Sequence, residues 1–102
     1  METIHNLKES IDYSSGATVS KIITKNKNGS TTLFSFDQGQ NLSEHTAPFD
    51  ATVLVLDGEC DISIAGESHL LSEGQLITMP ANVPHALEAV TAFKMLLIMI
   101  RA

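Results

Sequence analysis

Histidine offers the most versatile chemistry of any side chain in this 102-residue sequence, which contains four of them. Imidazole nitrogens bind zinc, copper, iron and nickel, and they exchange protons near neutral pH. His45 and His85 are forty residues apart, so they can form one two-imidazole site only if the fold brings their strands together. We expect His69, in a hairpin, to lie at the surface.

Short strands separated by glycine turns must position these histidines. Gly58, Gly66 and Gly74 recur every eight residues, and turns at such regular spacing are typical of a β-sandwich or barrel. The segment Asp61–Ile64 alternates polar and apolar residues, as a half-buried strand does. Further strands are expected at Thr18–Thr24, Thr31–Asp37, Val53–Leu56, Gln75–Met79, His85–Val90 and Lys94–Arg101. The sequence therefore predicts an all-β fold with little or no helix.

The length of the chain predicts a single domain over residues 1–102. We expect residues 18–102 to form a barrel, and residues 1–17 to form an N-terminal arm or an edge strand. The stretch Lys25–Gly29 is typical of a hairpin turn. The stretch Pro80–Pro84 must be irregular, because its two prolines lack backbone donors and restrict the residues before them.

Two segments resemble the two motifs of the cupin family. The first motif runs from a glycine through His-x-His and a glutamate to a second glycine, and the second runs from a glycine through Pro-x-Gly to a histidine. The residues that match in type and spacing are Gly39, His45, Gly58, Gly74, Pro80 and His85. The resemblance spans residues 39–89 and implies a jelly-roll barrel, the double-stranded β-helix of cupins. It also implies that His45 and His85 face one interior pocket.

The metal ligands of the family are only partly present. In metal-binding cupins the first motif supplies two histidines and a glutamate, and the second supplies a third histidine. The resemblance carries this role to His45 and His85, but Ala47 and Ala51 occupy the other two places. Since catalytic zinc sites use three protein ligands, we expect a weak site completed by water, or no metal site. The candidate metals are zinc, iron, nickel, copper and manganese.

Strand parity limits which carboxylate could complete a metal site. Side chains alternate faces along a strand, so Glu44 and Glu88 have the wrong parity to share a face with the histidines. Asp50 also has the wrong parity against Ala51, but Pro48 interrupts the strand and could reset it. Asp50 is therefore the one candidate third ligand.

Sulfur side chains offer two further kinds of site. Met79, Met95 and Met99 could join the histidines around Cu(I), although methionine more often fills gaps in a core. Cys60 shares strand parity with Ile62, which predicts a buried, inert thiol rather than a nucleophile.

A small-molecule pocket inside the barrel is the function we expect, because small barrels with unfilled interiors hold one ligand. No lysine or arginine occurs between Asn28 and Phe93, so we expect a neutral or weakly polar ligand. The alternative is a metal-dependent enzyme of the dioxygenase or isomerase type, using His45 and His85 with Asp50 or waters. The residues expected to line the pocket are His45, His85, Ala47, Ala51, Val53, Val55, Ile77, Met79 and Leu87.

Two other classes of function remain open. A metal-free enzyme could use one histidine as a general base. The cupin-like epimerases that work in this way have a tyrosine partner and basic residues for phosphates, whereas Tyr13, the only tyrosine, is remote from both motifs. A structural or regulatory partner domain would need no chemistry at all.

Composition argues against several partners. The net charge is −6, and nine of the twelve acidic residues lie between Asn28 and Phe93, so the sequence offers no basic patch for nucleic acid. No apolar run approaches the roughly 20 residues that a membrane helix needs. Cys60, the only cysteine, cannot form an internal disulfide, which fits a location in the reducing cytoplasm.

The last expected strand, Lys94–Arg101, is apolar on both faces. A strand of an antiparallel sheet usually shows one polar face to water, so something must cover the second apolar face. We expect a second copy of the chain to cover it in a homodimer, and the alternative cover is the N-terminal segment.

Overall fold

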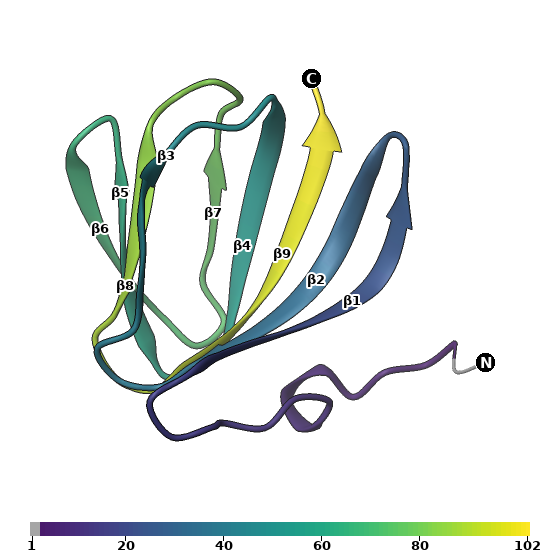
Figure 1. The fold of residues 1–102 in the computed structure, drawn as a ribbon, viewed down its shortest axis with the longest axis vertical. Helices are drawn as coiled ribbons and strands as arrows, with labels where there is room; N and C mark the ends of the chain where they lie inside the picture. Colours follow the sequence, from purple (N-terminus) through teal and green to yellow (C-terminus); the bar gives the residue numbers. More distant parts are fainter. Residues whose placement is uncertain (1–2) are drawn as a thin grey trace.

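The computed structural model of the protein describes residues 3–102, which form an almost entirely β structure (Figure 1). The strands are β1 (Thr18–Asn26), β2 (Gly29–Phe36), β3 (Asn41–His45), β4 (Phe49–Asp57), β5 (Glu59–Ile64), β6 (Glu67–Ser72), β7 (Leu76–Met79), β8 (His85–Ala89) and β9 (Phe93–Arg101). One 3-10 turn, η1 (Leu7–Glu9), lies in the arm formed by residues 3–17. The predicted all-β fold is confirmed. Within residues 3–102, no helix is long and apolar enough to cross a membrane.

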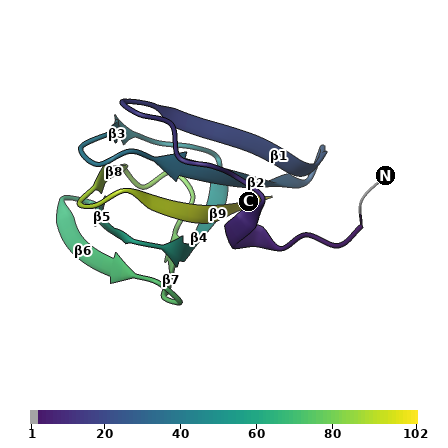
Figure 2. The ribbon, with the colours of Figure 1, turned by 90° about the horizontal axis from the view of Figure 1, so that it is seen from below.

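Two antiparallel sheets form the walls of a barrel (Figures 1 and 2). The five-stranded sheet has the order β1-β2-β9-β4-β7, and the four-stranded sheet has the order β3-β8-β5-β6. The β3–β4 and β7–β8 connections, the end of β9 and the β1–β2 turn all lie at the upper end in Figure 1. We call this end the mouth of the barrel. Segments from both ends of the sequence therefore meet at the mouth.

The inner faces of the two sheets pack into one core. The rings of Phe36 and Phe93 stack with centroids 4.7 Å apart, and both side chains are fully buried. Val53 and Val55 of β4 and Ile62 of β5 are buried from the opposing walls. Burying a side chain of this size contributes about 1.5–3 kcal/mol, so this closed half of the barrel stabilises the fold.

Gly58 makes the tight turn between β4 and β5. Its φ of +74° lies in the left-handed region that favours glycine. A Cβ atom at this position would lie 2.1 Å from the carbonyl oxygen of Ala92, which is an impossible contact. The second glycine of the first motif is therefore required by backbone geometry and by close packing of the chain.

The N-terminal arm covers part of the outer face of the five-stranded sheet. Lys94 Nζ donates a hydrogen bond to the carbonyl oxygen of Lys8 (2.6 Å), and Tyr13 Oη donates one to Asp57 Oδ2 (2.6 Å). The bond from Tyr13 lowers the pKa of Asp57, and burial together with the same bond raises the pKa of Tyr13. Leu33 of β2 and Lys94 of β9 are buried on this outer face. The N-terminal segment, which was the alternative cover for the last strand, therefore covers the start of β9.

The rest of the outer face stays partly open. Ile98 and Leu54 are half-buried, while Ile100 and Leu76 keep 60% and 57% of their surface exposed. These four residues, which we call the apolar outer strip, lie on the neighbouring strands β9, β4 and β7. The homodimer stays a prediction, and the apolar outer strip is the surface that it would bury.

Sedimentation or gel filtration at micromolar concentration tests the homodimer. We expect the wild-type chain to migrate as a dimer, and Ile100→Lys to give a monomer, because a buried unpaired ammonium group opposes association. Ile22→Lys, at an equally exposed isoleucine of the edge strand β1, is the matched control and should remain dimeric. A monomeric wild-type protein at that concentration contradicts the prediction.

Candidate functional site

His45 and His85 meet at the mouth of the barrel. They are directly opposite each other in the pairing of β3 with β8. Their Nε2 atoms are 3.1 Å apart, and the two rings meet edge to face with centroids 4.3 Å apart. His85 is buried with 7% of its surface exposed, whereas His45 is exposed. The pair therefore lies at the boundary between the interior of the barrel and solvent.

A β-bulge turns His45 inward. Leu42 pairs with Leu87 and His45 pairs with His85, so β3 advances three residues while β8 advances two. The extra residue lets both Leu42 and His45 face the interior, which strict alternation would forbid. The carbonyl oxygen of Ser43, within the bulge, accepts a hydrogen bond of 2.7 Å from His45 Nδ1.

The loop before β8 positions His85. Asn82 stands where the second motif has glycine, and its φ of +63° is the left-handed conformation that asparagine tolerates better than most residues. Its backbone N–H donates to the carbonyl oxygen of Ala47 (2.8 Å). Asp50 Oδ1 accepts a hydrogen bond of 2.9 Å from the N–H of Ala81. The structure therefore uses Asp50 to hold the loop, and its role as a third metal ligand stays a prediction.

The histidine pair opens into an apolar cavity of about 70 Å³ inside the barrel. Seven of the residues expected in the pocket line it, namely His45, His85, Ala47, Ala51, Val53, Met79 and Leu87. The expectation missed five others, which are Leu42, Ala86, Met95, Leu97 and Met99. The three methionines considered with the histidines thus share their cavity.

Val55 and Ile77 are not on the wall of this cavity. Val55 has the correct parity but pairs with Met95, deeper in the barrel, and is 1% exposed within the core. Ile77 pairs with Val53 and borders a separate groove between β6 and β7. Parity fixes the face of a strand but not the place of a residue on that face: Val55 lies deeper than the cavity, and Ile77 lies beside it on the edge strand β7.

Backbone carbonyls fix the hydrogen of both imidazoles at Nδ1. His45 Nδ1 donates to Ser43, and His85 Nδ1 donates to the carbonyl oxygen of Val83 (3.1 Å). A carbonyl oxygen can only accept, so neutral rings in this arrangement have bare Nε2 atoms. Two bare acceptors 3.1 Å apart repel each other. A metal ion between the two Nε2 atoms would remove this repulsion, and so would a hydrogen on one Nε2 that is donated to the other.

The donor set fits a metal only in part. Nitrogens about 2.0–2.1 Å from one ion, at about 90–110° to each other, are about 2.9–3.4 Å apart, which includes the observed separation. Metal-bound histidines also commonly donate their other N–H to a carbonyl, as these do. However, no group of three or more histidine, cysteine, aspartate or glutamate side chains within residues 3–102 has a metal-binding arrangement. An ion would be held by His45 and His85 and by ligands from outside the chain.

Two cationic side chains lie at the mouth, although the central part of the sequence contains no lysine or arginine. Arg101 pairs with Phe49, and Lys25 pairs with Ser30, on the inner side of the five-stranded sheet. Both cations line a groove of about 560 Å³ whose wall includes Met99. They are far from the motifs in sequence, but β1 and β9 bring them to the mouth.

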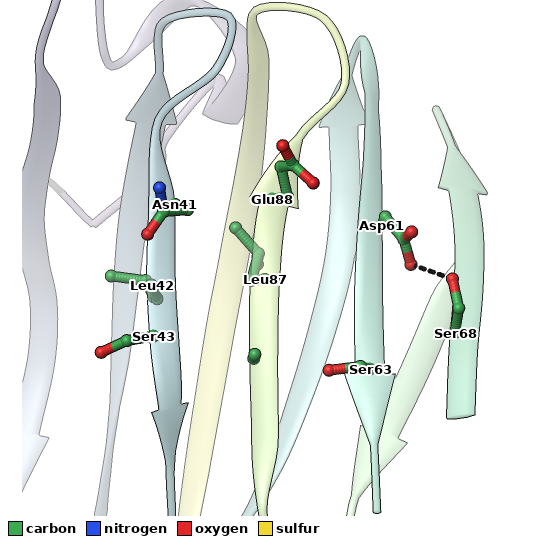
Figure 3. Close-up of a pocket in the computed structure, with 9 residues that line it drawn as sticks. Asn41, Leu42, Ser43, Asp61, Ser63, Ser68, Leu87 and Glu88 are labelled. Carbon is green, nitrogen blue, oxygen red and sulfur yellow. Dashed lines mark hydrogen bonds between the residues drawn. The ribbon is translucent and has the colours of Figure 1, made fainter. Parts of the chain in front are cut away.

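A second, polar hollow lies on the outer face of the four-stranded sheet (Figure 3). Asp61 and Glu88 stand directly opposite each other on β5 and β8, and like charges in this position are destabilising. Asp61 accepts a hydrogen bond from Ser68 of β6. The hollow faces away from the histidines, so it is not part of their site.

The remaining histidines lie outside the site. His69 of β6 pairs with Ile62 and is half-buried in the open groove between β6 and β7. An even spacing from Leu71, which faces the core, is the signal that could have predicted this. His5 lies in the N-terminal arm, and neither residue lines the cavity.

The fold agrees with the comparisons to known proteins. The family model of the cupin domain matches residues 32–101. This chain belongs to the cupin family, and its barrel is a double-stranded β-helix. The resemblance of the two motifs is thereby confirmed for the family and the fold.

Several solved structures are similar to the chain. A conserved protein of unknown function from Streptococcus pyogenes is 35% identical, with a TM-score of 0.94, over 100% of this chain and 90% of that one. A cupin 2 conserved barrel domain protein from Leptotrichia buccalis is 41% identical, with a TM-score of 0.92, over 95% of this chain and 47% of that one. The present chain thus spans about half the length of the Leptotrichia protein. A cupin superfamily protein from Desulfitobacterium hafniense is 27% identical, with a TM-score of 0.87, over 90% of this chain and 84% of that one. No curated protein matches the chain.

Cys60 is fully buried in the core, and its burial raises the pKa of the thiol to about 12. Because the thiolate is the reactive form, we expect the native protein to react with a disulfide reagent such as DTNB far more slowly than the denatured protein. Release of the coloured thiolate measures both rates, and Cys60→Ser supplies the background. Equal rates in the two states would show that Cys60 is accessible.

Proposed function

We propose that this cupin binds a small molecule in the barrel, and that His45 and His85 hold its polar group. The observation that supports this most directly is the composition of the cavity wall. The two imidazoles are its ionisable side chains, and aliphatic and methionine side chains make up the rest. A few polar groups in an apolar pocket fix the orientation of a ligand, while the apolar wall supplies much of the affinity.

The volume of the cavity limits the ligand. A water molecule needs about 10–15 Å³ of such space, so the 70 Å³ cavity holds a few waters or one compact organic group. Larger ligands would extend through the mouth, where His45 is exposed. Ala47 and Ala51, in the places of two family metal ligands, contribute to this space because their side chains are short.

Retention of metabolites tests the proposal. The purified protein is incubated with a small-molecule extract of cells, desalted, denatured, and analysed by mass spectrometry. We expect the wild type to retain a compound that His85→Ala loses, because the ligand then has one imidazole fewer. His69→Ala, outside the cavity, is the control and should retain it. The proposal fails if the wild type retains nothing, or if His45→Ala and His85→Ala both retain the same compound undiminished.

A second candidate function is that of a metal-dependent cupin enzyme. One arrangement favours it: both rings donate Nδ1–H to carbonyls and face each other with Nε2 at a separation suited to one ion. Bound zinc, iron, nickel, copper or manganese would supply Lewis acidity or redox chemistry at this place. His45 and His85 would hold the ion, and the carbonyl groups of Ser43 and Val83 would orient the two imidazole rings. The apolar wall of the cavity would shield the ion from water.

Elemental analysis tests the second candidate. The protein is expressed in medium supplemented with each metal, dialysed, and measured by mass spectrometry for metal per chain. A metal-dependent cupin should retain about one ion per chain, and His45→Ala and His85→Ala should each lose it, because one imidazole alone binds weakly. Asp50→Asn is informative here, since a variant that keeps the metal agrees with the loop-holding role of Asp50. Metal-free wild-type protein from every medium excludes this function.

A further inference from the structure

The inner face of the five-stranded sheet is apolar along the cavity and becomes positively charged at the mouth. Along β9, alternate residues face inward, so Arg101 follows Met99 on the face that lines the cavity. Across the sheet, Met99 pairs with Ser30, and Ser30 pairs with Lys25. The apolar wall therefore continues directly into a surface that carries two cations from β9 and β1.

Arg101 is held in place by its neighbours. Its guanidinium group stacks over the ring of Phe49, 4.9 Å from the ring centroid, and its Nε donates to the carbonyl oxygen of Lys27 (3.2 Å). Its backbone N–H also donates to the carbonyl oxygen of Asn28 (2.8 Å), which ties β9 to the β1–β2 turn. The terminal Nη atoms have no hydrogen-bond partner within residues 3–102. The group is thus positioned by Nε and by stacking, with its two best donors available.

No acidic side chain forms an ion pair with this surface in the part of the chain that the structure describes. The salt bridges there are those of Lys8 with Asp57 and Glu73, on the other side of the sheet. The groove at the mouth contains Lys25, Lys27 and Arg101 and no acidic side chain among the described residues. Half of the six basic residues of a chain with net charge −6 are therefore gathered at one groove.

The basic groove and the histidine cavity are adjacent, because Met99 forms part of the wall of both. A single ligand that passes Met99 would place one end in the cavity and the other in the groove. An arginine with free Nη donors is suited to a planar or tetrahedral oxyanion, which it can bind through two parallel hydrogen bonds.

We propose that the ligand of this barrel is a small anion, with a carboxylate or phosphate group bound by Arg101 and Lys25 at the mouth and a compact apolar body directed into the histidine cavity. This inference rests on the proposed small-molecule function and specifies its ligand class. It replaces the neutral ligand expected from sequence. Arg101 is the principal anion-binding residue, and Lys25 adds a second positive charge from β1 of the same sheet.

Titrations followed by NMR test the charge requirement. The probes are butanoate, its uncharged analogue butanamide, and propyl phosphate, each added to uniformly 15N-labelled protein. We expect butanoate or propyl phosphate to bind about tenfold or more tightly than butanamide, with shifts at Met99, Arg101 and His85, because charged hydrogen bonds are about twice as strong as neutral ones. The tighter of the two anions identifies the head group.

Matched variants assign the effect to the mouth. Arg101→Gln should weaken binding of the tighter anion about tenfold and leave butanamide unchanged, and Lys25→Gln should weaken it by a smaller factor. Lys21→Gln removes a lysine of the same strand at a position paired with Leu33 on the outer face, and it should have no effect. Unchanged spectra of the free variants away from the substituted residue establish that they fold.

The outcomes separate this inference from the proposed function. If butanamide and the anions bind equally at His85, or if Arg101→Gln leaves anion binding unchanged, the anion proposal is overturned while the binding function stands. If the wild type retains a metabolite without a carboxylate or phosphate group, the result is the same. If no probe binds and no metabolite is retained, both proposals are overturned.

Discussion

The cross-strand pairing of β3 with β8 is the constraint on which the site depends. It places His45 opposite His85 only because one extra residue in β3 changes the parity between Leu42 and His45. The same bulge supplies the Ser43 carbonyl that orients the His45 ring. On the other strand, the loop from Pro80 to Pro84 delivers His85 and supplies the corresponding carbonyl from Val83. Ring position and ring orientation thus arise from the same backbone features.

The strand order determines what lies beside the histidines. Because β9 sits between β2 and β4, the end of the chain reaches the mouth of the barrel, and Arg101 lies next to Phe49 at the start of β4. Lys25 reaches the same end through the β1–β2 hairpin. Ala47 and Ala51, at the positions of metal ligands in the first motif, have no polar atom in their side chains. The polar groups of the mouth therefore come from both the motif strands and the flanking strands.

Glycine spacing and strand alternation, which are local properties, were sufficient to predict the all-β fold, and the resemblance of the two motifs predicted the family and the meeting of the two histidines. The residues that sequence reasoning missed depend on pairing between distant strands. The inward position of Arg101 could have been predicted, since Arg101 shares parity with Met95, Leu97 and Met99, but only the strand order shows that this face opens at the mouth. The inward position of Lys25 could not have been predicted, because a register shift between Ile22 and Thr24 alters the parity of β1. The loop-holding role of Asp50 depends on the backbone of Ala81, which no side-chain pattern reveals.

The charge inside the mouth is opposite to the charge of the whole chain. Lys25, Lys27 and Arg101 line one groove beside the histidine cavity, in a chain whose net charge is −6. A metal ion held by His45 and His85 would add to this positive charge, and the low dielectric of an apolar cavity strengthens the attraction for an anion. The two candidate functions differ in whether a metal ion lies between the imidazoles. They agree on the sign of the field that a ligand meets, and this sign favours an anionic ligand in either case.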